Sequence, residues 1–347
     1  MSKINVGIIG CGAIAIHRHA PEYFANAGCE IAGYFDPVSQ RAKALCDRFG
    51  GRVYSSVEEM LSDEKIDAVS VCTSNATHAP ISIEALSKGK HVLCEKPMAI
   101  TFEDCTAMGK AAEQAGKVLM VGHNQRFAPA HVKAKSILES DELGKVITFR
   151  TTFGHRGPEF WSADKSVNTW FFNKGSAFLG AAADLGIHKL DLIMWLLEDT
   201  VQTVSAYCNT LDKKDSEGNL IGVDDNMICN LKMKNGAMGT LTASWTYYGD
   251  EDNSTVLYCE NGIIRIYDNP DYPVEVVKRN GERSYYKVGA IQTNDDKVQA
   301  NSGVIDAFVD AVVNRHTPAV PFEDAIEAMK VIFACVESSN KQTFIRL

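Results

Sequence analysis

The chain has 347 residues, too many for one ordinary hydrophobic core, and at roughly 150 residues per domain this length predicts two domains. Its composition, 45% hydrophobic and 23% charged, is that of a globular protein and excludes a disordered or fibrous one. The net charge of −9 comes without a concentrated basic stripe, and because an acidic surface repels phosphate, nucleic acid is not an expected partner.

Neither the first residues nor the cysteines indicate export. An apolar strand begins at Ile4 without a charged leader or an apolar signal segment before it, so we expect a cytoplasmic protein. No apolar run approaches the roughly 20 residues of a membrane helix, so no membrane contact is expected. The ten cysteines are scattered singly, without CxxC or zinc-like spacing, which predicts reduced thiols and no metal site.

The first third of the chain alternates short apolar runs with amphipathic stretches, a pattern typical of a parallel sheet with crossover helices. The runs are nearly continuous, as in strands that are buried on both faces. The predicted strands are Ile4–Ile9, Ile31–Phe35, Ala68–Cys72, His91–Cys94 and Val118–Val121. Ser56 and Thr101 each stand three positions before an acidic residue and predict two helix starts. Residues 1–123 are therefore expected to form a doubly wound α/β domain.

Residues 124–347 show a different pattern, in which long alternating segments are separated by turn signals such as Lys234-Asn235-Gly236, and these favour antiparallel pairing. The predicted strands are Val146–Phe153, Val201–Tyr207, Met227–Met233, Met238–Trp245, Thr255–Cys259, Ile263–Tyr267 and Val274–Lys278. Helical patterns near 180–197, 302–315 and 322–340 are expected to cover one face of the sheet. We predict an α+β domain with a large, mostly antiparallel open sheet, whose other face is buried against a second copy in a homodimer or homotetramer.

A glycine-rich segment, Gly10-Cys11-Gly12-Ala13-Ile14-Ala15, follows the first predicted strand and opens a helix. Gly10 permits a tight turn, Gly12 lets a pyrophosphate approach the backbone, and the helix N-terminus holds the phosphates. Asp36 ends the second strand, where a carboxylate accepts bonds from the adenine ribose hydroxyls. The pattern predicts a Rossmann domain that prefers NAD to NADP, because Asp36 would repel a ribose phosphate, although Arg41 would soften this preference. The alternative is a simple tight turn with Asp36 as the cap of the next helix.

Two further motifs carry a resemblance to a known family. Glu95-Lys96-Pro97 follows the strand His91–Cys94, and Asp184-Leu185-Gly186-Ile187-His188 lies much later in the chain. With the glycine-rich segment, they make the chain similar to the Gfo/Idh/MocA family, which includes glucose–fructose oxidoreductase and inositol dehydrogenase. The resemblance spans nearly the whole chain, including Thr73-Ser74-Asn75 with His78 and Arg126-Phe127 at the domain junction.

The resemblance implies a catalytic role for three residues. By this resemblance, His188 is the base, while Lys96 and Asp184 hold and polarise the reacting hydroxyl and help to relay its proton. Independently, Lys96 follows a parallel strand at the sheet edge where ligands bind, and Asp184 and His188 are spaced i, i+4 on one helix face. The alternative for the latter two is an intrahelical hydrogen-bonded pair.

The remaining candidate residues fall into two groups. Those expected to bind the cofactor are Gly10, Gly12, Ala13, Ile14, Asp36, Arg41, Thr73, Ser74, Asn75, His78, Glu95 and Lys96. Those expected to bind substrate are Lys96, Arg126, His155, Trp161, Trp170, Asp184 and His188. Aromatic faces combined with polar groups suit polyols, although the rings could equally belong to the core or to an oligomer interface.

These observations lead to one functional hypothesis with two alternatives. The hypothesis is an NAD-dependent dehydrogenase that oxidises a secondary ring hydroxyl of a sugar, sugar derivative or cyclitol, or reduces the matching ketone. The first alternative is a glycoside-processing enzyme that oxidises its sugar only transiently with held NAD. The second is a non-catalytic nucleotide-sensing protein on the same scaffold.

Overall fold

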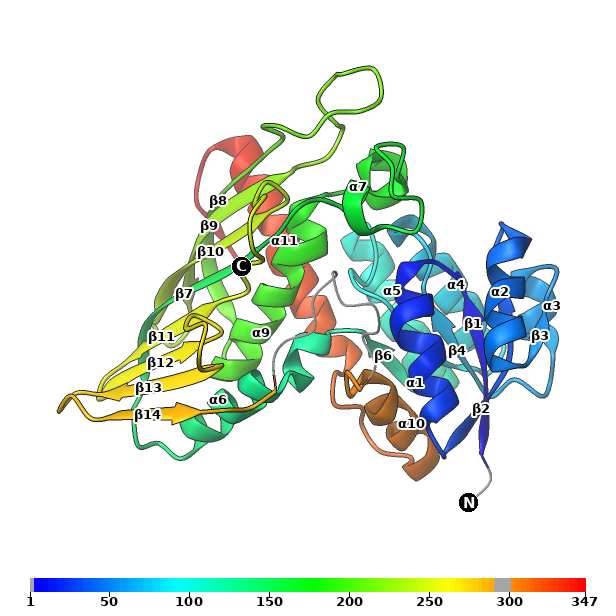
Figure 1. Ribbon diagram of the computed structural model, residues 1–347, viewed down its shortest axis with the longest axis horizontal. Helices are drawn as coiled ribbons and strands as arrows, with labels where there is room; N and C mark the ends of the chain where they lie inside the picture. The colour runs from blue at the N-terminus through cyan, green and yellow to red at the C-terminus, as the bar shows by residue number, and fades with distance from the viewer. Residues whose placement is uncertain (1–2, 290–300) are drawn as a thin grey trace.

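A six-stranded parallel sheet forms the N-terminal domain of the computed structural model, which describes residues 3–289 and 301–347 (Figure 1). The strand order is β3-β2-β1-β4-β5-β6, so the order in which strands are added reverses between β1 and β4. The strands are β1 (Ile4–Ile9), β2 (Cys29–Phe35), β3 (Arg52–Val53), β4 (Ala68–Val71), β5 (His91–Cys94) and β6 (Leu119–Val121). All five predicted strands are confirmed. The added edge strand β3 has only two residues, both exposed, so it has no apolar pattern.

The connections between these strands are helical. They are a π-helical turn η1 (Ala15–His19), α1 (Ala20–Ala25), α2 (Ser39–Phe49), α3 (Val57–Ser62), α4 (Asn75–Ser87) and α5 (Phe102–Ala115). The Ser56 hydroxyl accepts a hydrogen bond from the Glu59 N–H, and the Thr101 hydroxyl accepts one from the Asp104 N–H, each at 3.0 Å. Both predicted helix starts are therefore confirmed.

The C-terminal domain contains a nine-stranded sheet in the order β14-β13-β12-β11-β7-β10-β9-β8-β15, in which β7 and β10 pair in parallel and the other neighbours pair antiparallel. Its strands are β7 (Val146–Gly154), β8 (Val201–Asn209), β9 (Asn226–Met233), β10 (Met238–Ser244), β11 (Thr255–Cys259), β12 (Gly262–Ile266), β13 (Val274–Lys278), β14 (Arg283–Tyr286) and β15 (Ile345–Arg346). The seven predicted strands are confirmed, and β14 and β15 extend the two edges.

Helices pack on one face of this sheet (Figure 1). The helical elements from residue 124 onward are η2 (Asn124–Phe127), α6 (Pro129–Glu139), α7 (Pro158–Trp161), η3 (Trp170–Phe172), α8 (Lys174–Ala177), a π-helical turn η4 (Ala182–Gly186), α9 (Ile187–Leu197), α10 (Val304–Asn314) and α11 (Phe322–Lys341). Of these, α6, η4, α9 and α11 contact the sheet. The opposite face carries exposed apolar side chains, among them Tyr207, Ile228 and Met238.

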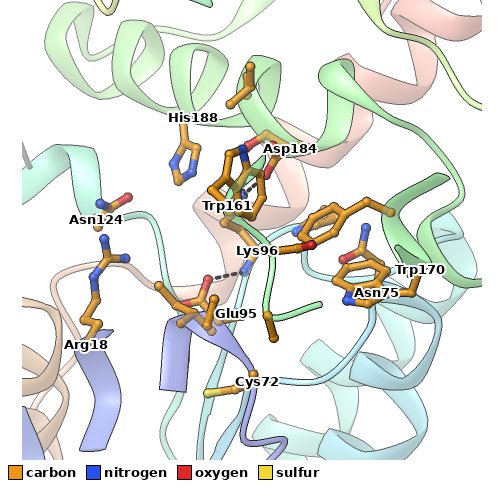
Figure 2. A pocket seen from close by; sticks show the side chains of 18 of the residues that line it. Arg18, Cys72, Asn75, Glu95, Lys96, Asn124, Trp161, Trp170, Asp184 and His188 are labelled. Atoms are coloured by element: carbon orange, nitrogen blue, oxygen red, sulfur yellow. Dashed lines mark hydrogen bonds and ion pairs between the residues drawn. The ribbon is translucent and has the colours of Figure 1, made fainter. Parts of the chain in front are cut away.

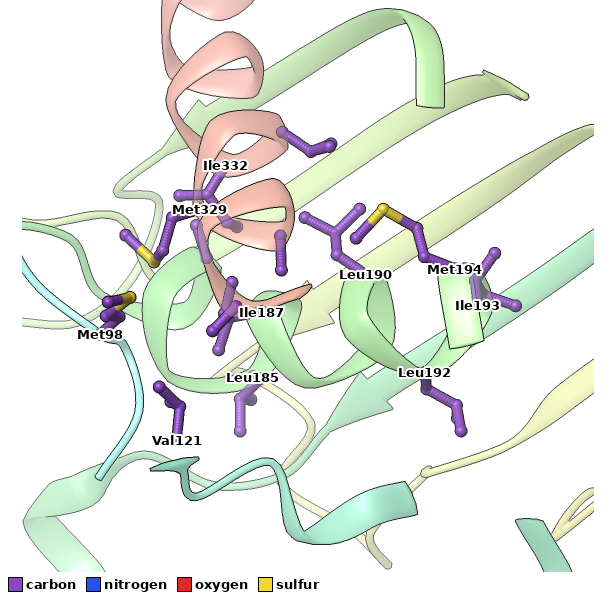
Figure 3. Packing of buried hydrophobic residues seen from close by; sticks show 14 of the residues in the cluster. Met98, Val121, Leu185, Ile187, Leu190, Leu192, Ile193, Met194, Met329 and Ile332 are labelled. Atoms are coloured by element: carbon purple, nitrogen blue, oxygen red, sulfur yellow. The ribbon is translucent and has the colours of Figure 1, made fainter. Parts of the chain in front are cut away.

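A single apolar cluster joins the two domains and fixes how they sit together. Met98 and Val121 of the N-terminal domain pack in the same cluster as Ile187 of α9 and Met329 and Ile332 of α11 (Figure 3). Each of these side chains is at most 1% exposed. Since packed interiors resist displacement, the cluster holds the end of β5 and the start of α9 in a constant relation.

The position of α10 corrects one expectation. The prediction that residues 302–315 cover the second sheet is wrong, because α10 packs on the N-terminal domain, with Phe308 and Val309 in the same cluster as Val6 and Tyr23. The Asn26 side-chain amide also donates a hydrogen bond to Asp306 at 2.6 Å. An apolar helix face shows that a helix is buried, but the periodicity does not show against which sheet.

Two further properties follow from the fold. All ten cysteines lie in the described parts of the chain and none forms a disulfide, as predicted. Within residues 3–289 and 301–347, no helix is both long and apolar enough to span a bilayer.

The packing of α10 can be tested with Phe308→Ala. Removing this fully buried ring is expected to lower the free energy of unfolding by about 3–5 kcal/mol, since a cavity replaces its contacts. Hydrogen–deuterium exchange should rise in β1 and α1 and stay constant in β8–β10; the reverse pattern would contradict this packing. Phe344→Ala, which changes a ring that is 70% exposed, is the control and should leave both measurements unaltered.

Candidate active site

A cleft of about 1280 Å³ lies between the two domains, where the carboxyl ends of β1, β4 and β5 face the start of α9. This is the edge at which a doubly wound sheet binds its ligand, next to the reversal of strand order between β1 and β4. Of the predicted cofactor residues, Gly12, Ala13, Ile14, Arg41, Thr73, Asn75, His78, Glu95 and Lys96 line the cleft. Of the predicted substrate residues, Lys96, Trp161, Trp170, Asp184 and His188 do.

The glycine loop has the geometry that a dinucleotide requires. Gly10 adopts φ +90°, and a Cβ on it would lie 2.5 Å from the carbonyl oxygen of Cys72, so only glycine fits. A Cβ on Gly12 would meet no described atom within 4 Å, because this residue faces the open cleft. The loop therefore combines a constrained turn with an open approach to its backbone, which fits a pyrophosphate at the first helical turn.

Asp36 directly follows β2 beside this loop and is buried. One of its carboxylate oxygens accepts a hydrogen bond from the Cys11 N–H and the other accepts one from the Val38 N–H, both at 2.8 Å. The carboxylate thus shapes the loop, and Asp36 is not among the residues that line the cleft. Its bond to Val38 closes a turn before α2 but does not cap the helix, because Val38 is itself the N-cap residue and α2 has no side-chain cap bond.

The segment after β4 supplies three cleft residues. Thr73, Asn75 and His78 line the cleft, whereas Ser74, which precedes α4, is not among its lining residues. The Asn75 side-chain amide donates to the carbonyl oxygen of Ala177 in the other domain at 2.9 Å. The His78 ring lies 2.8 Å from the carbonyl oxygen of Pro97, which follows a cis Lys96–Pro97 peptide. The first contact joins the two domains, and the second holds α4 against the segment that follows β5.

Glu95 lines the cleft, but its carboxylate is bonded to other groups of the protein. One oxygen lies 2.9 Å from Nε2 of His19, whose Nδ1 lies 3.1 Å from the Ser70 hydroxyl. Burial alone would raise the pKa of Glu95, but the hydrogen bond and charge of His19, with the charges of Arg18 and Lys96, lower that pKa to about 2. Glu95 is therefore ionised and holds η1 against the end of β5, while its contact with a cofactor stays a prediction.

Lys96 and Asp184 form an ion pair across the cleft (Figure 2). The Lys96 ammonium donates to Asp184 Oδ1 at 2.7 Å and to the Asp184 carbonyl oxygen at 2.9 Å. Asp184 Oδ2 accepts a further bond from the Trp245 indole N–H at 3.0 Å. Because an ammonium has three N–H donors and two of them bond to Asp184, one remains for a ligand oxygen.

His188 reaches the same space from the first turn of α9 (Figure 2). Its ring lies against Phe153 and His123, with centroid distances of 5.9 and 6.2 Å. Burial, followed by the positive charge of Lys96, lowers the pKa of His188 well below its usual range. At neutral pH the imidazole is consequently unprotonated and able to accept a proton.

The backbone beneath Asp184 differs from the regular helix that the i, i+4 spacing suggests. Asp184 lies in the π-helical turn η4, and α9 begins only at Ile187. The buried Asp224 carboxylate accepts bonds from the N–H groups of Gly180 and Ala182 at 2.9 and 2.7 Å, just before this turn. Such wide turns recur at functional sites, because they redirect one side chain without ending the helix.

Two predicted substrate residues do not reach the cleft. The Arg126 guanidinium is buried in bonds to Asp191, at 2.8 and 2.6 Å, and to Asp324, at 2.7 Å, so it links α9 to α11 instead of meeting a ligand. His155 packs with its ring edge against Trp161, at a centroid distance of 6.0 Å. Neither is a lining residue of the cleft.

One wall of the cleft is aromatic and consists of Trp161, Trp170 and Phe171. Trp170 stacks on Phe171 at 3.9 Å between centroids, and Trp161 meets the edge of Phe171 at 5.0 Å. Glu251 and Asn253, which also line the cleft, supply polar groups. The wall thus offers flat apolar faces next to hydrogen-bonding groups.

Lys189, the residue after the candidate base, holds that polar side of the cleft. It is 0% exposed, and its ammonium donates to the carbonyl oxygen of Asn253 at 2.9 Å. Burial lowers the pKa of Lys189 to about 7, against the opposing charges of Asp252 and Glu251. Lys189 is therefore a positioning residue for the segment that carries Glu251 and Asn253.

Comparison with known proteins agrees with this geometry. Residues 4–123 match the model of an oxidoreductase family with an NAD-binding Rossmann fold, Gfo/Idh/MocA, and residues 131–265 match the C-terminal domain model of the same family. The chain belongs to the Gfo/Idh/MocA family. Its N-terminal domain is accordingly the family's NAD-binding domain.

Similar members of the family act on carbohydrates, by their names. Levoglucosan dehydrogenase of Pseudarthrobacter phenanthrenivorans is 27% identical over 99% of this chain and 98% of its own length. Glucose-6-phosphate 3-dehydrogenase of Bacillus subtilis is 31% identical over 64% of this chain and 62% of its own. A solved levoglucosan dehydrogenase in complex with NADH and L-sorbose superposes with a TM-score of 0.87 at 25% identity, covering 100% of this chain and 99% of that one.

Several residues of the site are absent from the sequence prediction. Trp245 bonds to Asp184 from 61 positions away, and Asp224 bonds to Gly180 and Ala182 from 44 and 42 positions away; no local pattern marks either residue. Arg18, which lines the cleft from η1, lies only six positions after Gly12. Its place in the first turns after the glycine loop is a signal that could have identified it. In the described ranges, no group of three or more potential metal ligands comes together.

The two loop glycines provide a matched test of the cofactor cradle. Gly10→Ala is expected to lower Tm by several degrees, because its Cβ would collide with the Cys72 carbonyl at an unfavourable φ. Gly12→Ala should leave Tm unchanged but weaken NAD binding at least about tenfold, since its methyl group would occupy the approach to the backbone. Calorimetry and thermal unfolding measure both. Unaltered NAD binding by Gly12→Ala would exclude this loop as the cradle.

Proposed function

We propose that the protein is an NAD-dependent dehydrogenase that oxidises a secondary ring hydroxyl of a sugar, sugar derivative or cyclitol, or reduces the matching ketone. The observation that carries the proposal is the neutral imidazole of His188 at the cleft, beside the Lys96–Asp184 ion pair. A pure binding site has no need of an unprotonated base next to a charged donor.

The residues that would hold the dinucleotide are those of the N-terminal edge of the cleft. The backbone of Gly12 and Ala13 would receive the pyrophosphate, and Thr73 and Asn75 the part that extends toward Lys96. Asp36, which bonds to the glycine loop beside the cleft, would bind the adenine ribose. The chemistry that the bound dinucleotide would supply is a hydride acceptor for the carbon that bears the hydroxyl.

The chain's own residues would handle the proton. The third N–H of Lys96 donates to the substrate oxygen and polarises it, while the two bonds to Asp184 hold the ammonium in place. His188 takes the hydroxyl proton, so the oxygen is left to form the carbonyl as the hydride departs. In the reducing direction, the protonated His188 returns this proton.

The aromatic wall supports a carbohydrate or cyclitol as substrate. Trp161, Trp170 and Phe171 present flat faces on which the C–H side of a ring can lie, and Glu251 and Asn253 can bind its hydroxyls. Levoglucosan and glucose 6-phosphate dehydrogenases among the relatives act on compounds of this kind, to judge from their names.

The direct test is turnover with a panel of anhydrosugars, inositols, free and phosphorylated sugars and glycosides, followed by the absorbance of reduced nicotinamide. Wild-type protein should reduce NAD with at least one ring polyol, and His188→Ala should lower kcat by about 10²–10⁴-fold with NAD binding retained. Because the pKa of His188 lies well below its usual range, kcat/KM should stay level as the pH falls from 8 through 6.5.

Other outcomes of this assay identify the alternatives. Glycoside cleavage without net NADH would indicate transient oxidation with held cofactor. NAD binding without turnover of any kind would indicate a nucleotide sensor. Full activity of His188→Ala would refute its role as the base.

We also propose that the open face of the nine-stranded sheet packs against a second copy. Tyr207 and Ile228 are paired neighbours on this face and are 65% and 55% exposed, so they form adjoining parts of an exposed apolar patch. Ile228→Lys should convert an oligomer into monomers in light scattering after gel filtration. Val132→Lys, at an exposed position of α6, is the control; a wild-type monomer at micromolar concentration would contradict the proposal.

A further inference from the structure

Arg41 and Asp164 form an ion pair that spans the cleft. Arg41 belongs to α2 of the N-terminal domain, and Asp164 lies in the loop after α7 of the other domain. Arg41 Nη2 donates to Asp164 Oδ1 at 2.5 Å, and both residues line the cleft. The pair is half-exposed, with 32% and 51% of the two side chains accessible, so its net contribution to stability is small. Its effect is therefore expected on a ligand in the cleft.

The pair lies at the end of the cleft that would receive the adenosine. Arg41 is in the first turn of α2, where its N–H bonds to the Val38 carbonyl oxygen, five positions after Asp36. Burial and then the charge of Asp36 raise the pKa of the Cys11 thiol to about 12, while the charge of Arg41 lowers it. Both charges thus act on the glycine loop, and Arg41 stands beside the position of the adenine ribose.

An arginine at this position is the group that would bind a ribose 2′-phosphate, since a guanidinium matches phosphate with two parallel hydrogen bonds. Here the guanidinium is already bonded to a carboxylate. Together, Asp36, Arg41 and Asp164 carry two negative charges and one positive charge, so this part of the cleft disfavours an additional phosphate. Without the charge of Asp164 the balance would be neutral, and the guanidinium would be free to turn to the ligand.

We propose that Asp164 is a cofactor-selectivity residue, which occupies the Arg41 guanidinium from the opposite domain and thereby makes the cleft prefer NAD to NADP. The inference rests on the proposed function and adds to it the residue that sets the choice of dinucleotide. Asp164 also belongs to the segment that carries Trp161, Ser162 and Ala163 into the cleft, so the same loop meets both the cofactor end and the substrate wall.

The experiment measures dissociation constants of NAD and NADP by calorimetry at low salt, which requires no turnover. Asp164→Asn keeps the shape of the side chain and removes its charge. We expect this variant to bind NADP about tenfold more tightly, as a freed charge-assisted bond to phosphate allows, and to bind NAD within about threefold of wild type. The gain should shrink as salt is added, because the released charges are exposed.

Two controls separate a specific effect from a general one. Asp47→Asn removes one negative charge from an exposed position of the same helix as Arg41 and should leave NADP binding unchanged. In the double variant Arg41→Met, Asp164→Asn the gain should disappear, since it needs the guanidinium. A gain that survives the loss of Arg41, or an equal gain in Asp47→Asn, would overturn the inference.

The wild-type measurement separates a failure of this inference from a failure of the proposed function. If wild type binds NAD, and Asp164→Asn binds NADP no more tightly than wild type does, Asp164 does not set selectivity and the proposed function stands. If wild type binds neither dinucleotide, the proposed function is wrong and this inference falls with it.

Discussion

The ion pair between Lys96 and Asp184 joins the two domains at the centre of the cleft, and the other groups of the site are arranged around it. Both side chains are largely buried, at 17% and 8% exposure, and removing charges from water is costly. The cost is offset because each charge is fully used: Asp184 takes bonds from Lys96 and from Trp245, and Lys96 bonds twice to Asp184. Loss of either partner would leave an uncompensated buried charge.

The same lysine also determines the state of the candidate base. After burial, the charge of Lys96 is the largest influence that lowers the pKa of His188. The group that would polarise a hydroxyl oxygen therefore also keeps the neighbouring imidazole ready for the proton. The apolar cluster of Met98, Ile187 and Met329 maintains this arrangement, because it fixes α9 against the end of β5 (Figure 3).

The cleft has two different sides, and they depend on different kinds of support. The cofactor side depends first on the glycine loop, in which Gly10 can only be glycine and to which Asp36 bonds. The substrate side is assembled from distant segments: Lys189 holds Asn253, and His155 backs Trp161. The cofactor side is therefore readable from a short motif, whereas the substrate side is readable only from contacts.

The sequence by itself determined the strands, the helix starts and the glycine loop, because each rests on a local pattern of apolar period, backbone conformation or spacing. Lys96, Asp184 and His188 came from the resemblance to the family's motifs, and the structure brings them to one cleft. The sequence did not determine that α10 returns to the N-terminal domain, that Arg126 is buried against Asp191 and Asp324, or that Asp184 lies in a π-helical turn. An apolar face or a charged side chain reveals that a partner exists but carries no information about which one. The partners of Asp184 and Arg41 come from segments about 61 and 123 positions away, and only the tertiary structure brings them together.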